Sequence, residues 1–242
     1  MNTIASRLAS VEQRIAAACA AHGRAPGTVA LLAVSKTFDA DAVCEAVQAG
    51  QRAFGENYIQ EGVDKIAEVA RRLAPQGVAR NALQWHCIGP IQSNKTRLVA
   101  EHFDWVHSID RLKIAQRLSE QRPDTRPPLQ VCLQVNIDGG ANKSGVAPEQ
   151  VAELAQQVQA LPRLRLRGLM TIPEPGDDYA AQLAVHQQAH ALWQQLRAQG
   201  LALDTLSMGM SADLEAAIAA GSTMVRVGSA IFGARVRPPS TA

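Results

Sequence analysis

The feature of this sequence that most limits its fold is a regular alternation of short apolar runs with amphipathic segments. The clearest of these runs is Ala30–Val34, and an uninterrupted apolar run of this kind is typical of a strand buried on both faces of a parallel sheet. The eight runs are Val29–Ser35, Arg52–Gly55, Leu83–Gly89, Asp104–Ile109, Leu129–Ile137, Leu164–Thr171, Leu203–Met208 and Thr223–Gly228. Helical spacing occurs between them, over Asp39–Ala49, Ile59–Leu73, Asn94–His102, Pro148–Ala160, Tyr179–Gln199 and Ala212–Ala220, and at Leu112, Ala115 and Leu118. Eight strands, each followed by a helix or the start of one, indicate a closed parallel barrel.

The segments before the first strand and after the last one complete this pattern. Apolar residues recur at helical intervals near the N-terminus, at Ile4, Leu8, Val11 and Ile15, whereas the helix after the eighth strand looks short. We therefore predict an α/β fold: a single TIM-type (β/α)8 barrel domain over residues 1–242, with an extra N-terminal helix that fills the gap in the outer ring. A doubly wound open sheet is the alternative, but its first turn is usually glycine-rich, and "SKTFDAD" contains no glycine.

The composition of the chain argues against nucleic acid and membranes as partners. The net charge is +2, and no run of Lys or Arg is longer than Arg71-Arg72, which does not favour binding to nucleic acid. No apolar stretch approaches the length of a membrane span. The four cysteines form no C-x-x-C pair, and Cys87 and Cys132 fall inside apolar runs, so we expect buried free thiols in a reducing compartment. The sequence thus predicts a cytoplasmic protein with no nucleic-acid partner, no membrane partner and no metal site.

Lys36 follows the first strand at the end where barrels of this type carry their chemistry. Most lysines at strand ends simply point into solvent, and that is one interpretation of this residue. The other is an amine whose pKa is lowered by partial desolvation, so that it can form a Schiff base with a carbonyl compound. The residues at the other strand ends indicate which of these two interpretations of Lys36 applies.

The loops after the seventh and eighth strands have the composition of a phosphate site. In "SMGMS", Gly209 allows the backbone to approach a ligand closely, and Ser211 stands where a helix N-cap would be. In "VGSA", Gly228 and Ser229 repeat the pair one strand later. Each pair alone could be an ordinary helix cap. Together, at the two strands where barrel phosphate sites are usually built, they predict a phosphate site.

Arg226 lies within "TMVRVG", an otherwise apolar strand, so its guanidinium needs a partner near the strand end. That partner could be a carboxylate, in a buried ion pair. Alternatively, the guanidinium could be placed against the ring nitrogen of a bound heterocycle. A phosphate site, a lysine amine and a planar ring between them together describe pyridoxal phosphate as the cofactor.

Several stretches, taken together, resemble a known family. They are "AVSKT", "FGENYIQE", "WHCIGPIQSNK", "NKSG", "GLMTIP" and "LSMGMSADLEAAIAAGSTMVRVGSAIFG". In this order they are similar to the pyridoxal-phosphate homeostasis proteins of the YggS/PROSC type, a single barrel similar to the N-terminal domain of alanine racemase. The resemblance implies a protein that binds pyridoxal phosphate and balances cofactor and amino-acid pools. It also implies partners among pyridoxal-phosphate-dependent apoenzymes or the enzymes that make the cofactor, and we expect a monomer, with a dimer as the alternative.

The resemblance also implies roles for individual residues. Lys36 would hold the cofactor as a Schiff base, and Arg226 would face the pyridine nitrogen. The remaining cofactor-binding positions that match are Asn57 beside the ring, and Ser211, Gly228 and Ser229 at the phosphate with Met210 next to them. His86 and Lys95 would lie at the pocket rim, where they either contact the ligand or only support the residues that do, or serve solubility. The family usually has an acidic residue before "KSG", where this chain has glycine and alanine, so the role of the Asp138–Gly145 loop and of Lys143 stays open.

The same residues suggest weak chemistry, and we predict no catalytic residue. Arginine is always protonated and can only donate, so Arg226 would keep the ring nitrogen unprotonated and the cofactor a poor electron sink. Racemases on this barrel add a tyrosine from a second domain, whereas this sequence contains only Tyr58 and Tyr179 and no further domain is expected. An amino-acid racemase or decarboxylase on the same barrel is one alternative. A cofactor-free aldolase that uses Lys36 is the other.

Overall fold

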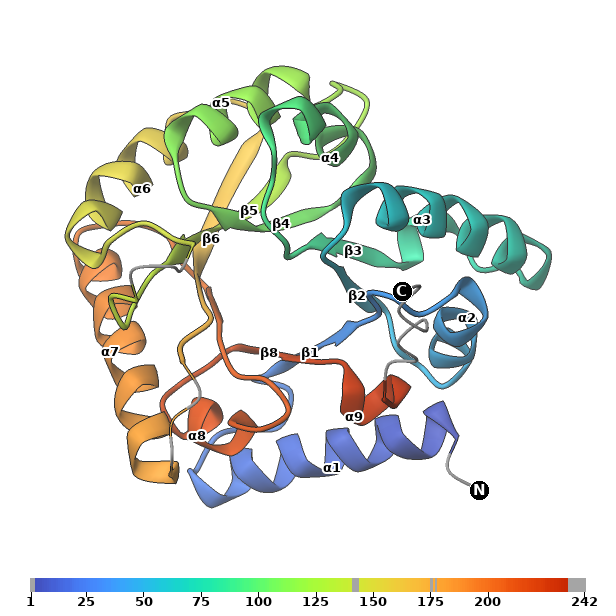
Figure 1. The fold of residues 1–242 in the computed structure, drawn as a ribbon, viewed down its shortest axis with the longest axis horizontal. Coiled ribbons are helices and arrows are strands. Elements are labelled where there is room, and N and C mark those ends of the chain that lie inside the picture. Colours follow the sequence, from blue (N-terminus) through green and yellow to red (C-terminus); the bar gives the residue numbers. More distant parts are fainter. Residues whose placement is uncertain (1–2, 141–143, 175, 177, 235–242) are drawn as a thin grey trace, which may run out of the picture.

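The computed structural model describes residues 3–140, 144–174, 176 and 178–234. In this part of the chain eight parallel strands form a closed barrel, in which each strand pairs with the next and β8 pairs with β1 (Figure 1). The strands are β1 Ala30–Val34, β2 Ala53–Glu56, β3 Gln84–Cys87, β4 Trp105–Ile109, β5 Leu129–Val135, β6 Leu164–Thr171, β7 Thr205–Ser207 and β8 Met224–Val227. The predicted barrel is confirmed, and every predicted run contains its strand except that β2 extends one residue further, to Glu56.

Helices surround the barrel on its outside (Figure 1). They are α1 Ile4–Ala21, α2 Ala40–Gln48, α3 Ile59–Leu73, α4 Thr96–His102, α5 Leu112–Gln121, α6 Val151–Gln159, α7 Tyr179–Ala198, α8 Leu214–Ala219 and α9 Ser229–Phe232. Short 3-10 turns occur at Ala74–Gln76, Arg80–Ala82, Ser93–Lys95 and Pro148–Gln150. None of the described helices is long and apolar enough to cross a membrane.

The N-terminal helix α1 takes the place predicted for it. Its residues Ile4, Leu8, Val11 and Ile15 are buried, and the helix packs against α8, α9 and α2. Helix α9 has only four residues, so the outer ring would be open there without α1 (Figure 1). Two arginines of α1 reach the segments that follow β7 and β8: Arg14 donates to the carbonyl of Ser211 in the β7–α8 loop at 3.1 Å, and Arg7 to that of Ile231 in α9 at 2.6 Å. The extra helix therefore contacts both segments that carry the predicted phosphate site.

The apolar core has two parts, because successive strand residues point alternately out of and into a barrel. The larger part lies between the barrel and its helices. Smaller clusters fill the inside, one formed by Leu32, Val34, Ile88 and Met224, and another formed by Trp105, Cys132 and Met170. All four cysteines of the chain are buried and unpaired, as predicted.

Candidate functional site

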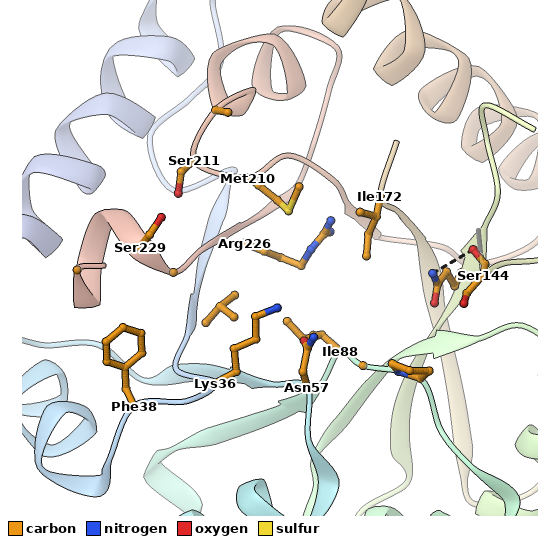
Figure 2. A pocket seen from close by; sticks show the side chains of 17 residues that line it. Lys36, Phe38, Asn57, Ile88, Ser144, Ile172, Met210, Ser211, Arg226 and Ser229 are labelled. Atoms are coloured by element: carbon orange, nitrogen blue, oxygen red, sulfur yellow. Dashed lines mark hydrogen bonds between the residues drawn. The ribbon is translucent and has the colours of Figure 1, made fainter. Parts of the chain in front are cut away.

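A pocket of about 580 Å³ opens at the carboxyl ends of the strands. Its walls include every residue that the sequence predicted for cofactor binding: Lys36, Asn57, Met210, Ser211, Arg226, Gly228 and Ser229. Figure 2 shows Lys36 and Arg226 extending into the same space, with the hydroxyls of Ser211 and Ser229 together on one side of it. The structure thus brings these side chains to one place.

Arg226 is a buried cation at the floor of this pocket. It lies in β8 level with Leu32 of β1, and the residue is only 4% exposed. Its Nη1 donates to Ser207 Oγ and its Nη2 to the backbone carbonyl of Thr171, both at 2.8 Å. Within the described residues no carboxylate lies at ion-pairing distance from it, so the alternative of a buried ion pair is not found there. Burial lowers the pKa of Arg226 to about 10, which still leaves it charged at neutral pH.

The loop that carries Lys36 is held from below by charged side chains of α3. Thr37, the next residue, has φ 68°, a left-handed conformation that is unfavourable for a β-branched residue. Its N–H donates to Glu61 Oε1 at 2.6 Å, and Lys65 Nζ donates to the Ser35 carbonyl at 2.8 Å. Both residues flanking Lys36 are therefore fixed by hydrogen bonds, which points the lysine into the pocket (Figure 2).

Lys65 and Glu56 form a buried ion pair beneath this loop. Lys65 Nζ lies 2.8 Å from Glu56 Oε1 and 2.9 Å from Glu61 Oε1, so its three donors are all used when the Ser35 carbonyl is included. Glu56 is 0% exposed, and its other oxygen has no partner among the described residues. Burial raises the pKa of Glu56 above its ordinary 4.5, although Lys65 and Ser35 oppose the shift. The pair therefore depends on Lys65 to keep a carboxylate charged inside the protein.

We expect Lys65→Met to lower the free energy of unfolding by about 3–5 kcal/mol at pH 7, because a buried Glu56 carboxylate loses its cation. Urea unfolding measures the loss, and the double variant Glu56→Gln/Lys65→Met is the control, which should recover most of it. A carboxyl with a raised pKa in the folded state loses stability as the pH rises above its unfolded pKa. The deficit of the single variant should therefore shrink as the pH falls towards 5, and a deficit that does not change with pH would contradict this role.

The loop after β7 is fixed differently from the helix cap that the sequence suggested. Helix α8 begins at Leu214, so Asp213, not Ser211, occupies the N-cap position, and the predicted cap at Ser211 is wrong. Asp213 Oδ1 accepts the N–H of Met210 at 2.6 Å, and its Oδ2 lies 2.9 Å from His186 Nε2 of α7. Gly209 before it has φ 93°, and a Cβ there would lie 2.4 Å from that of Ala217. Only glycine fits this tight turn, which leaves the Ser211 side chain in the pocket wall.

The loops after β2 and β3 touch each other at the opposite wall. A Cβ on Gly89 would lie 2.2 Å from the carbonyl oxygen of Asn57, so the two backbones are in direct contact there. Both residues line the pocket. The glycine in "CIGP" is thus needed to bring Asn57 to its place.

Two predicted positions are wrong, and one lies outside the described residues. His86 was expected at the pocket rim, but it is 0% exposed inside the barrel, within 2.9 Å of His107, because its side chain points inward from β3. Lys95 lies in a 3-10 turn and does not line the pocket either. Lys143 is not among the described residues, while Ser144 of the same loop lines the pocket.

Sequence reasoning also missed two sets of residues. Lys65 and Glu61 of α3, with Glu56 of β2, support the Lys36 loop. They were missed because charged residues on a helix usually lie on its solvent-exposed face. His107 and Ser207 form a buried polar row with Arg226. A signal was present, since His107 and Ser207 are polar residues within runs that the sequence predicts as buried strands. The described residues contain no group of three or more His, Cys, Asp or Glu that could hold a metal ion.

Comparisons with known proteins agree with this architecture. The family described as alanine racemase, N-terminal domain, matches residues 7–236. A protein from Vibrio cholerae is 58% identical over 235 residues, covering 97% of this chain and 98% of its own length. One from Pseudomonas aeruginosa is 60% identical over 235 residues, covering 97% of each chain. Both are named pyridoxal phosphate homeostasis protein.

Solved structures give the same result. PipY from Synechococcus elongatus, solved with pyridoxal phosphate bound, is 38% identical with a TM-score of 0.79, covering 96% of this chain and 100% of its own. Alanine racemase from Corynebacterium glutamicum is 20% identical with a TM-score of 0.63, and this chain covers 62% of it, which shows a shared fold alone. Because of its identity to the curated relatives over nearly its whole length, the chain belongs to the family of pyridoxal phosphate homeostasis proteins.

Proposed function

We propose that this protein binds pyridoxal 5'-phosphate in the pocket at the barrel mouth, with the cofactor held as a Schiff base on Lys36. Its role is intracellular homeostasis of the cofactor and of the linked amino-acid pools, without strong catalysis of its own. One observation carries the proposal: an amine and a buried cation without a carboxylate partner among the described residues face one pocket that also presents two serine hydroxyls.

The residues fit the chemistry of the cofactor, which is at once an aldehyde, a phosphate and a pyridine. Lys36 supplies the amine for the aldehyde. Ser211, Ser229 and the glycine backbone at Gly228 supply hydrogen-bond donors for the phosphate, at the two strands where barrels usually bind it. Arg226 supplies a donor for an aromatic nitrogen. When bound, the cofactor stabilises negative charge on an amino acid's α-carbon.

Two observations support a cofactor that is held and little used. Arg226 remains a cation at neutral pH, so it can only donate to a ring nitrogen and would keep that nitrogen unprotonated. Neither tyrosine of the chain lines the pocket: Tyr58 is 59% and Tyr179 47% exposed. A racemase needs an acid/base on each face of the substrate, and no tyrosine in the pocket wall supplies one.

We further propose that the chain acts as one barrel domain, as a monomer in the cytoplasm, where its four unpaired thiols suit a reducing environment. Its partners would be apoenzymes that use pyridoxal phosphate or enzymes that produce it. The test is titration of the purified protein with pyridoxal phosphate, which should give a visible absorbance band that borohydride bleaches. Rapid racemisation or decarboxylation of amino acids by the loaded protein would favour the enzyme alternative instead.

The two serines provide a separate test of how the phosphate is bound. We expect Ser211→Ala/Ser229→Ala to weaken binding of pyridoxal phosphate on the order of 10–100-fold more than binding of unphosphorylated pyridoxal. Each hydrogen bond to a charged oxygen contributes roughly 1.5–3 kcal/mol, and water recovers part of that loss. Fluorescence titration with both ligands measures the two changes. Equal weakening for both would exclude these hydroxyls from a phosphate site.

A further inference from the structure

A row of hydrogen-bonded side chains leads from Arg226 into the interior of the barrel. Arg226 Nη1 donates to Ser207 Oγ at 2.8 Å, and Ser207 Oγ lies 3.0 Å from His107 Nδ1. His107 Nε2 in turn lies 2.9 Å from His86 Nδ1. The four residues come from β8, β7, β4 and β3, and none is more than 4% exposed.

The direction of these hydrogen bonds follows from counting partners. A guanidinium can only donate, so Ser207 Oγ accepts from Arg226. If Ser207 then donates to His107 Nδ1, His107 carries its hydrogen on Nε2 and donates to His86 Nδ1. Only the Nε2–H of His86 is then left without a partner among the described residues. In the opposite arrangement, His107 donates to Ser207 and His86 donates to His107. Two groups are then left without a partner, the Ser207 hydroxyl hydrogen and the His86 Nε2 lone pair. Each buried polar group left unpaired costs roughly 1–3 kcal/mol, so the first direction is favoured.

Apart from Arg226 itself, the row carries no charge. Burial lowers the pKa of His86 to about 3 and that of His107 well below its ordinary value, so both rings are neutral at physiological pH. In this arrangement Ser207, His107 and His86 each turn a lone pair towards Arg226 and a hydrogen away from it, so their dipoles are aligned. The guanidinium is thus stabilised by these dipoles and by the Thr171 carbonyl. A carboxylate in the same place would pair with the guanidinium and neutralise it.

We propose that Ser207 and His107 are positioning residues that hold Arg226 as a hydrogen-bond donor at the pocket floor, with no carboxylate at ion-pairing distance among the described residues, which makes the site select ligands whose ring has an acceptor nitrogen. This inference rests on the proposed function. It explains why β3, β4, β7 and β8 each place a polar side chain of this row inside a barrel that also contains apolar clusters.

The test compares pyridoxal phosphate with 1-deazapyridoxal phosphate, in which a C–H replaces the ring nitrogen while aldehyde and phosphate are kept. The readout is the ratio of their dissociation constants. For the wild type we expect about a tenfold or larger preference for the nitrogen-containing ring, as one charge-assisted hydrogen bond provides. Ser207→Ala should bring this ratio close to one. The matched control is Ser222→Ala, which removes an equally buried hydroxyl that bonds only backbone carbonyls, with Met208 O at 2.7 Å. It should keep the wild-type ratio.

His107 gives a second pair of variants in case Ser207→Ala does not fold. His107→Leu removes the acceptor for Ser207 and should lower the ratio, whereas His107→Asn keeps an oxygen near the Nδ1 position and should restore it. Nitrogen-15 NMR of the wild type should show both histidines neutral, with the hydrogen on Nε2, at pH 7.

Three outcomes overturn the inference: a Ser207→Ala protein with the wild-type ratio, a His107 ring with its hydrogen on Nδ1, or a wild type that binds both ligands equally. The last leaves cofactor binding itself standing. A wild type that binds neither ligand overturns the proposed function instead.

Discussion

Replacing Lys36 by alanine should abolish covalent attachment of pyridoxal phosphate at this position and weaken binding on the order of 100-fold, or about 2.7 kcal/mol. The chain has five lysines, and among those described only Lys36 lines the pocket. The amine of Lys65 is already bound by Glu56, Glu61 and the Ser35 carbonyl. The phosphate and ring contacts would persist, so we expect weak, non-covalent binding rather than none.

The change should leave the barrel folded. Lys36 is only half-buried, and the backbone on either side of it is held by α3 through Glu61 and Lys65. We therefore expect the free energy of unfolding to change by less than about 0.5 kcal/mol, as for a surface position. Lys113→Ala, at an exposed lysine of α5 outside the pocket, is the control and should bind as the wild type does. A Lys36→Ala protein that takes up one pyridoxyl group per chain with wild-type affinity would contradict the assignment.

Arg226→Glu should make the loaded protein more reactive, although less stable. A glutamate at this position would favour a protonated ring nitrogen, which makes the cofactor a stronger electron sink. We expect exchange of the α-proton of alanine into heavy water to rise about tenfold or more, equivalent to about 1.4 kcal/mol of barrier. Without cofactor, a carboxylate in a site that is 4% exposed should cost about 3 kcal/mol of stability, because it replaces the cation for which Ser207 and Thr171 are arranged.

The control for this prediction is Arg226→Gln, which removes the cation without supplying a carboxylate. Arg226→Gln should not accelerate exchange. Adding cofactor should also raise the stability of Arg226→Gln less than it raises the stability of Arg226→Glu. Exchange is followed by proton NMR at saturating cofactor. If Arg226→Glu still binds cofactor but exchanges no faster than the wild type, Arg226 does not govern the ring, and an unprotonated ring nitrogen is not the cause of weak chemistry.

The barrel could be predicted from the sequence because its signals are local. Each of the eight apolar runs contains its strand, apart from the last residue of β2, and the spacing of Ile4, Leu8, Val11 and Ile15 matches the buried face of α1. The pocket was predictable for the same reason, since the carboxyl ends of parallel strands must meet at one rim. Lys36 and Arg226 could thus be brought together without knowing any distance.

What could not be predicted depends on register and packing. His86 follows an apolar strand start as a rim residue would, and only the pairing of β3 with β4 shows that it points towards His107. The cap predicted at Ser211 is wrong because the turn that begins at Gly209 continues to Asp213, and α8 starts only at Leu214. The Lys65–Glu56 pair joins a helix to a strand end, and no short motif signals such a contact.

The most direct test of the central claim is to identify the lysine that carries the cofactor. The wild-type protein is saturated with pyridoxal phosphate, reduced with borohydride, digested, and its peptides are mapped by mass spectrometry. We predict one pyridoxyl group per chain, on Lys36. A pyridoxyl group found mainly on another lysine, or none at all, would contradict the proposal that this pocket holds the cofactor through Lys36.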